Sequence, residues 1–271
     1  MSIKRLLKLK KFRVLVSIIA IVFLFFAGKP FLDAIYVPVI VMYHPVGEKS
    51  GIPNGYGAKL NVTPAAFEKQ MRFLHERNYN VIPLVEFIEK IKKHEDIPAG
   101  TLAITFDDGL KNNFLHAYPV LKKYNFPATI FVALDFVGKE NFLTRSDIRT
   151  MRKDNISIGS HTVSHRWLPS LDEKGIEREL YDSKKILEGL SGGIVQTLSY
   201  PLGGYDERVK KIAKDVGYIG AVATNPGPTK PKDDIFALKR IRISMTSNNL
   251  ITFLIETSGY YTFIKEIRDE D

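Results

Sequence analysis

The sequence predicts an α/β fold built on a parallel sheet or barrel. Short segments rich in apolar and β-branched residues alternate with longer segments whose apolar residues recur at helical spacing. Such alternation is typical of parallel strands joined by crossover helices. In addition, residues able to do chemistry directly follow several expected strands, where parallel α/β folds place their active sites. These residues are His44, Asp107, Asp108, His161 and the loop that begins at Pro201.

The expected strands are short and bounded by turn-forming or polar residues. The segment 102–106, Leu-Ala-Ile-Thr-Phe, has the composition of a buried strand and leads directly into two carboxylates and a glycine. In chain order the expected strands lie at 37–42, 81–82, 102–106, 128–132, 156–160, 197–200, 219–223 and 238–243.

Helices are expected between these strands. Thr63 followed by Pro64 is typical of a helix start, because threonine caps free backbone amides and proline fits the first turn. Phe67, Met71 and Leu74 then recur on one helical face. Further helices are expected around 84–91, 113–124, 172–190 and 207–216.

The net charge of +9 is concentrated at the N-terminus. Residues 1–13 contain six lysines and arginines and no acid, which leaves only +3 for the remaining chain. This distribution argues against a nucleic-acid-binding protein. The chain has no cysteine, which excludes disulfides, a thiol nucleophile and a thiolate metal site.

An uncharged apolar stretch at 14–27 follows the basic start. Its length suits a signal peptide, but no Ala-x-Ala cleavage site follows, and apolar residues continue to Leu32, so a helix could reach the roughly 20 residues that span a bilayer. The positive-inside rule then keeps the basic segment in the cytoplasm. We expect a cytoplasmic tail at 1–13, an uncleaved single-pass membrane anchor at 14–32 and an extracytoplasmic domain at 37–271; secretion after signal cleavage is the alternative.

Three motifs carry candidate chemistry: Thr105-Phe-Asp-Asp-Gly109, His161-Thr-Val-Ser-His165 and Ser199-Tyr-Pro-Leu-Gly-Gly204. Alone, the first is better explained as a turn that ends a strand, and the third is equally well explained as a turn. However, two imidazoles and a carboxylate are a common ligand set for a catalytic Zn²⁺. At a spacing of four residues, the two histidines can face the same way on one helical turn, and Asp108 would complete the set.

Together the motifs resemble the polysaccharide deacetylases, carbohydrate esterase family 4, which are built on the NodB homology domain. The first two motifs are complete, the third is partial, and the resemblance spans 37–243. It implies a distorted (β/α) barrel of about seven parallel strands, which the transmembrane helix expected here would precede. The start, Val-Pro-Val-Ile-Val-Met-Tyr-His44, looks like the subgroup that acts on poly-N-acetylglucosamine.

The resemblance also implies roles for individual residues. Asp108, His161 and His165 would hold a divalent metal, Zn²⁺ or alternatively Co²⁺ or Ni²⁺, and Asp107 would be the general base. The backbone amide of Leu202 would help to hold the oxyanion. Tyr205 would line the sugar site.

Two positions depart from the family pattern. Ser199 stands where many members carry an arginine that orients the base, and Arg240 or Arg242 could supply this cation. The family's late Leu-x-His, whose imidazole protonates the departing amine, is missing, because no histidine follows His165. His44 is the remaining candidate for that general acid.

The expected function is therefore metal-dependent release of acetate from N-acetylglucosamine-containing polysaccharide outside the cell. The alternative is a sugar-binding cell-surface protein that has lost activity through the two departures. A serine hydrolase is disfavoured, because no Gly-x-Ser-x-Gly elbow stands between an expected strand and a following helix; the match at 189–193 lies at the end of an expected helix. Peptidoglycan and exopolysaccharide both remain open as substrates, and neither oligomeric state nor any protein partner is indicated.

Overall fold

The computed structural model describes residues 36–48, 58–224 and 234–261. The chain from Val37 onward forms one compact unit. The expected basic tail at 1–13 and membrane anchor at 14–32 lie outside the described residues. Among the helices that the structure describes, none has the length and apolar character needed to cross a membrane.

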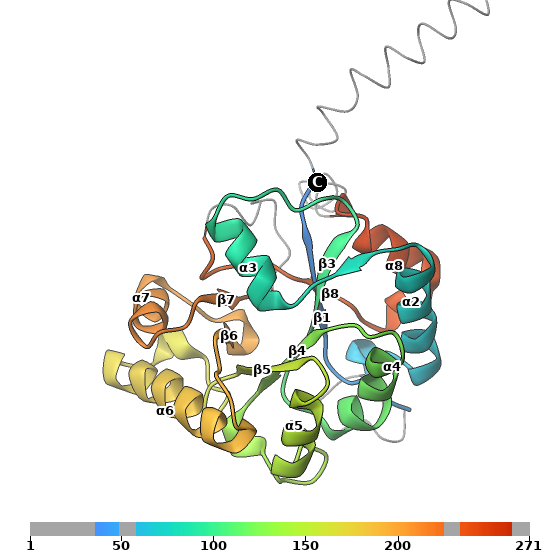
Figure 1. Cartoon of the computed structure of the whole chain (residues 1–271). Coiled ribbons are helices and arrows are strands. Elements are labelled where there is room, and N and C mark those ends of the chain that lie inside the picture. The colour runs from blue at the N-terminus through green and yellow to red at the C-terminus, as the bar shows by residue number, and fades with distance from the viewer. Residues whose placement is uncertain (1–35, 49–57, 225–233, 262–271) are drawn as a thin grey trace, which may run out of the picture. The chain divides into compact units, whose positions relative to one another are not determined.

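The strands form one parallel sheet, as the sequence predicted, and their order in the sheet is β7-β6-β5-β4-β3-β1-β8 (Figure 1). β2 pairs with the beginning of β3, on the edge whose later part pairs with β4. The strands are β1 (Val39–Tyr43), β2 (Asn80–Val81), β3 (Thr101–Phe106), β4 (Ala128–Val132), β5 (Ile156–Ser160), β6 (Thr197–Ser199), β7 (Gly220–Val222) and β8 (Ile241–Arg242).

The segment that leads into β8 closes the sheet into a distorted barrel. Leu238 forms a parallel bridge with Val222 of β7, and two backbone hydrogen bonds flank that bridge. A few residues later, β8 pairs with β1 through Met42 and Arg242. The first and last strands of the sheet are therefore linked through this segment, and the parallel α/β architecture agrees with the predicted distorted barrel.

The helices surround the strands (Figure 1). Thr63 caps the first of them by accepting a hydrogen bond from the Ala66 amide, with Pro64 in the first turn, as expected. They are α2 (Pro64–Glu76), α3 (Leu84–Lys92), α4 (Tyr118–Lys123), α5 (Arg145–Arg152), α6 (Glu173–Ser191), α7 (Glu207–Asp215) and α8 (Leu250–Thr257).

Two helices, α5 and α8, were not predicted. In α5 only Ile148 and Met151 are buried apolar residues, too few to produce a clear periodic pattern. The sequence of α8, Leu-Ile-Thr-Phe-Leu-Ile-Glu-Thr, is apolar on most sides and lacks a polar face. The helix expected at 113–124 is divided into a π-helical turn, Asn113–Ala117, and α4.

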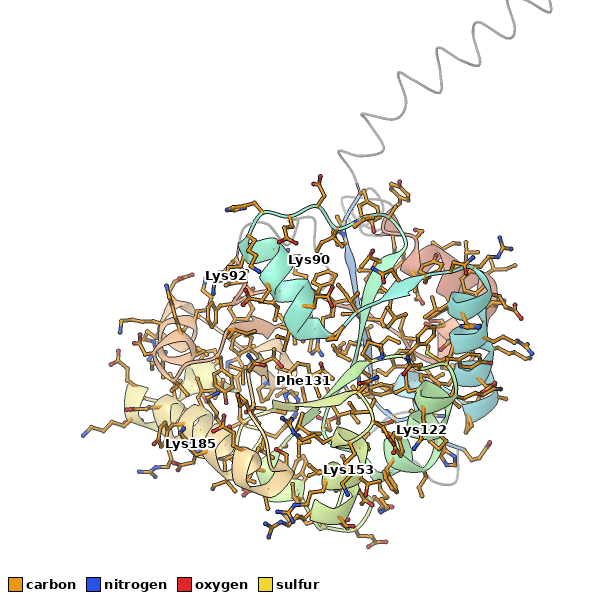
Figure 2. All side chains as sticks on the ribbon, in the orientation of Figure 1. Lys90, Lys92, Lys122, Phe131, Lys153 and Lys185 are labelled. Carbon is orange, nitrogen blue, oxygen red and sulfur yellow. The ribbon has the colours of Figure 1, made fainter. Side chains whose placement is uncertain are left out.

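Alternate side chains of the strands fill the barrel. Ile40, Ala103, Phe131 and Val222 belong to one buried cluster with the apolar face of α3. Figure 2 shows Phe131 among the central strands, while the labelled lysines lie around the outer helices. Because side chains alternate along a strand, Thr105 and Asp107 share the inward side of Ala103. The base candidate is therefore presented at the carboxyl end of the barrel interior.

Candidate active site

The end of β3 aims two adjacent carboxylates in different directions. Asp108 and Gly109 both have left-handed backbone conformations, with φ of 72° and 70°. Only glycine adopts this conformation freely, and a Cβ at Gly109 would also lie 3.2 Å from the Val132 side chain. Asp108, which is not a glycine, is therefore conformationally strained, and strained residues of this kind cluster at functional sites.

His161 and His165 lie in the loop after β5, and the expected helical turn between them is wrong. The amide of His161 continues the sheet by donating to the Val132 carbonyl at 2.9 Å. The chain then follows an irregular path in which Thr162 and His165 have φ of 65° and 55°. These two left-handed residues, rather than helical periodicity, bring the imidazole rings to a centroid distance of 4.8 Å.

The structure brings Asp108, His161 and His165 together at the carboxyl end of the barrel. The Nε2 atoms of both histidines lie 3.3 Å from Oδ1 of Asp108, and the three ligand atoms lie within 4.8 Å of one another. Asp108 and His161 are buried, and His165 is half-buried. Burial alone would raise the pKa of Asp108, but its hydrogen bonds with the two histidines hold that pKa well below its usual range.

The donor set fits a divalent cation. Nδ1 of His161 lies 2.7 Å from the Ser199 carbonyl oxygen, which can only accept, so Nδ1 carries the proton and a neutral imidazole presents the Nε2 lone pair to Asp108. In that protonation state two electron-rich atoms face each other, and a divalent cation bound by both would remove their repulsion. Burial would lower the pKa of His161, but the negative charges of Asp108 and Asp107 raise it overall. The site therefore favours positive charge at this position.

Glu179 of α6 fixes the histidine loop, and the sequence analysis missed it. Its Oε2 accepts hydrogen bonds from the amides of Val163 and Ser164, both at 2.9 Å, and its Oε1 accepts from the Ser164 hydroxyl. Glu179 lies between Ile176 and Leu180 on the buried face of α6. A carboxylate on the apolar face of an otherwise amphipathic helix was the available signal.

Arg240 forms a fully buried ion pair with Asp107. Its Nη1 and Nη2 atoms donate to the two carboxylate oxygens at 2.7 and 2.6 Å. The other three N–H groups donate to Thr105 Oγ1, Ser199 Oγ and the Ala223 carbonyl, so all five donors of the guanidinium are used. Burial would raise the pKa of Asp107, but Arg240 lowers it overall, which keeps the carboxylate ionised.

Of the two cation candidates, the structure therefore places Arg240 against the base candidate, while Arg242 is exposed. Ser199 leaves space for the guanidinium and hydrogen-bonds to both partners of the pair, with its hydroxyl 3.2 Å from Asp107 Oδ2. The cation that the family resemblance led us to expect in the third motif thus comes here from the chain segment preceding β8.

His44 lies after β1, beside the end of β3. Its Nδ1 is buried and has no hydrogen-bond partner in the described part of the chain. Burial lowers the pKa of His44, although the charges of Asp107 and Asp108 act in the opposite direction. The resting imidazole is therefore mainly neutral at neutral pH.

The third motif forms a turn, Pro201–Gly203, after β6. Leu202 has φ of 56° and exposes 65% of its surface. Tyr205 stacks on Tyr200 with a centroid distance of 5.1 Å, and the Tyr200 hydroxyl donates to the Phe236 carbonyl at 2.8 Å. The turn is thus anchored by buried aromatic packing, while Leu202 faces solvent.

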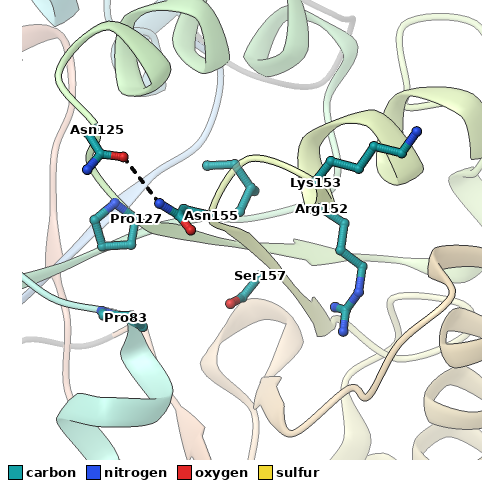
Figure 3. A pocket seen from close by; sticks show the side chains of 8 residues that line it. Pro83, Asn125, Pro127, Arg152, Lys153, Asn155 and Ser157 are labelled. Atoms are coloured by element: carbon teal, nitrogen blue, oxygen red, sulfur yellow. Dashed lines mark hydrogen bonds between the residues drawn. The ribbon is translucent and has the colours of Figure 1, made fainter.

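A separate pocket lies at the opposite, amino ends of β4 and β5 (Figure 3). Pro127 and Asn155, which line it, directly precede these two strands, and Asn155 donates to Asn125 at 3.2 Å. None of the candidate site residues lines this pocket. Since parallel barrels carry their chemistry at the carboxyl ends, we assign the active site to the Asp108 end.

The barrel and the position of its charged cluster place the chain among α/β-barrel enzymes. A family model described as polysaccharide deacetylase matches residues 94–221. The chain is 34% identical over 205 residues to a Bacillus subtilis protein named "Putative polysaccharide deacetylase YxkH", covering 76% of this chain and 71% of YxkH. The chain belongs to the polysaccharide deacetylase family, whose members are hydrolases of N-acetyl amide bonds.

Two further relatives support this membership. The poly-beta-1,6-N-acetyl-D-glucosamine N-deacetylase of Staphylococcus aureus is 27% identical over 198 residues, which cover 68% of each chain. The structure of the Streptococcus pyogenes deacetylase PplD in complex with acetate matches with a TM-score of 0.71 and 27% identity, covering 80% of this chain and 97% of PplD.

We predict that Arg240 and Asp107 are strongly coupled in stability. Arg240→Met leaves a buried carboxylate unpaired and should lower the free energy of unfolding by about 3–5 kcal/mol. In an Asp107→Asn background the same change should cost much less, which denaturant unfolding of the four proteins of the cycle would measure. Arg242→Met, at an exposed position, is the control and should stay within about 0.5 kcal/mol. Equal costs of Arg240→Met in both backgrounds would contradict the coupling.

Proposed function

We propose that this protein hydrolyses N-acetyl groups of N-acetylglucosamine-containing polysaccharide in a reaction that depends on a divalent metal, Zn²⁺ or alternatively Co²⁺ or Ni²⁺. The observation that carries the proposal is the convergence of Asp108, His161 and His165 beside an ionised Asp107. A pure sugar-binding protein would need neither the three converging donors nor the buried Arg240–Asp107 pair.

The residues divide the chemistry between them. Asp108, His161 and His165 would hold the divalent ion, which would supply Lewis acidity toward the attacking water and the acetamide carbonyl. Asp107 accepts the proton of the attacking water. Arg240 holds the carboxylate in one orientation through two parallel hydrogen bonds. The backbone amide of Leu202 donates to the oxyanion that develops on the acetamide oxygen.

His44 completes the proposed proton path. The departing amine is a poor leaving group unless it is protonated, so a donor is needed beside Asp107. Burial keeps the resting imidazole of His44 mainly neutral, so His44 must gain a proton during the reaction before it can act as an acid. Asp107, which accepts a proton from the attacking water, is the nearby source of that proton. We assign His44 to deliver this proton to the amine nitrogen. Its unpartnered buried Nδ1 supports a role beyond packing.

The substrate class rests on the relatives. The Staphylococcus aureus relative is named for poly-beta-1,6-N-acetyl-D-glucosamine, which is an exopolysaccharide. Peptidoglycan also contains N-acetylglucosamine, so both polymers are assayed in the test. Tyr205 is the side chain of the third motif that we propose to line the sugar site.

We predict that Asp108→Ala, His161→Ala and His165→Ala each lose bound metal and acetate release together. Metal content by elemental analysis and acetate release from both polymers, with and without a chelator, measure these losses. His75→Ala, a histidine of α2 outside the site, is the control and should keep both. Stoichiometric metal in a His161/His165 double variant would refute the site, and chelator-resistant acetate release would refute metal dependence.

We further predict that His44→Ala lowers turnover about 10²-fold with metal content unchanged. If Asp107 and His44 handle the same proton in sequence, their effects should not add. An Asp107→Asn/His44→Ala double variant should then be no slower than Asp107→Asn alone. A multiplicative loss in the double variant, or nearly normal turnover of His44→Ala, would remove His44 from the proton path.

We also propose that residues 14–32 anchor the protein in the cell membrane, with residues 37–271 outside the cytoplasm. The apolar stretch preceded by six basic residues supports this arrangement. Membrane fractionation combined with intact-mass measurement should find the full-length chain in the membrane. A soluble chain lacking residues 1–27 would show that the segment is a cleaved signal peptide instead.

A further inference from the structure

An exposed tryptophan stands next to the metal-site candidates. Trp167 is the only tryptophan of the chain, follows His165 by two residues, and exposes 46% of its surface. The core does not need the large side chain of Trp167, because the neighbouring Leu168 is fully buried and anchors this segment. Large aromatic side chains exposed beside an active site are candidates for substrate contact.

The indole ring rests on the loop of the third motif. A Cβ placed on Gly204 would lie 2.5–2.9 Å from Cε3, Cδ2 and Cζ3 of Trp167, so the ring packs directly over the glycine backbone. Gly204 has an ordinary φ of −79°, which shows that space for the indole, and not backbone conformation, requires glycine here. Trp167 therefore connects the loop of His165 with the loop of Leu202.

The backbone that carries the ring is also held in place. The Trp167 carbonyl accepts hydrogen bonds from the amide and the hydroxyl of Ser170, at 3.2 and 2.7 Å. One side of the indole is thus supported by Gly204, and nearly half of its surface stays open to solvent. A flat, preorganised aromatic surface loses little conformational entropy when a ligand binds to it.

The ligand that suits such a surface is a pyranose ring. The faces of a sugar ring carry C–H groups, which can pack on an aromatic face while the hydroxyl and acetamide groups at the rim stay hydrated. We propose that Trp167 is a stacking platform for a sugar residue of the polymer next to the residue being deacetylated. This inference rests on the proposed function and makes Trp167 a determinant of substrate affinity, without a part in the chemistry.

Intrinsic fluorescence tests the platform directly, because all tryptophan emission comes from Trp167. Titrating the full-length, metal-loaded protein with β-1,6-linked N-acetylglucosamine pentamer should shift the emission to shorter wavelength and protect it from acrylamide quenching. N-acetylglucosamine monomer, which cannot occupy two neighbouring positions, should leave the emission unchanged at the same sugar concentration.

Kinetics with the same pentamer give the second readout. Trp167→Ala should raise KM about 10-fold, with kcat within about twofold and metal content unchanged, because stacking contributes mainly to binding. Trp167→Phe should recover most of the loss. Tyr181→Ala is the matched control, since Tyr181 on α6 has a similar exposure of 48% and should leave KM unchanged.

The outcomes separate the two proposals. Acetate release by the wild-type protein with no change in emission, or a Trp167→Ala variant with unchanged KM, overturns the platform and leaves the proposed function standing. A pentamer-dependent emission shift without acetate release from the pentamer or from either polymer supports the platform and overturns the proposed function. If Trp167→Ala does not fold, Trp167→Phe and the wild-type emission still decide the question.

Discussion

The buried pair of Arg240 and Asp107 is the interaction on which the rest of the structure depends. The guanidinium of Arg240 hydrogen-bonds to Thr105 in β3 and Asp107 just after it, to Ser199 at the end of β6, and to the carbonyl of Ala223, the residue after β7. The segment carrying Arg240 is also the one that closes the barrel between β7 and β1. The closing contacts of the barrel and the charge state of the proposed base therefore depend on the same segment of the chain.

The arrangement of the three candidate metal ligands, Asp108, His161 and His165, depends instead on backbone strain that other contacts compensate. Asp108 and His165, and the turn residue Thr162, hold left-handed backbone conformations that are unfavourable for non-glycine residues. The compensation comes from the sheet on one side and from Glu179 on the other, which satisfies two amides of the histidine loop. A hydrogen-bonded carboxylate on a long helix thus stabilises a strained loop, and strain retained in this way is typical of sites that must be preorganised.

The loop of the third motif connects the parts of the site. Leu202 and Gly204 follow β6 directly, and Ser199 at the end of that strand contacts Asp107, Arg240 and, through its carbonyl, His161. A serine in place of the arginine found in many relatives therefore does not leave the base without a cation. It leaves room for a cation that arrives from another strand.

The sequence by itself determined the parallel α/β class, the main strands, the family and the candidate metal-donor residues, because each of these is encoded in local patterns or short motifs. Only the tertiary structure decided between Arg240 and Arg242, since which of them faces Asp107 depends on how the last segment crosses from β7 to β1. The irregular path between His161 and His165, and the role of Glu179, were likewise invisible to a local pattern. They arise from contacts between segments far apart in the chain, and spacing along the sequence carries no information about such contacts.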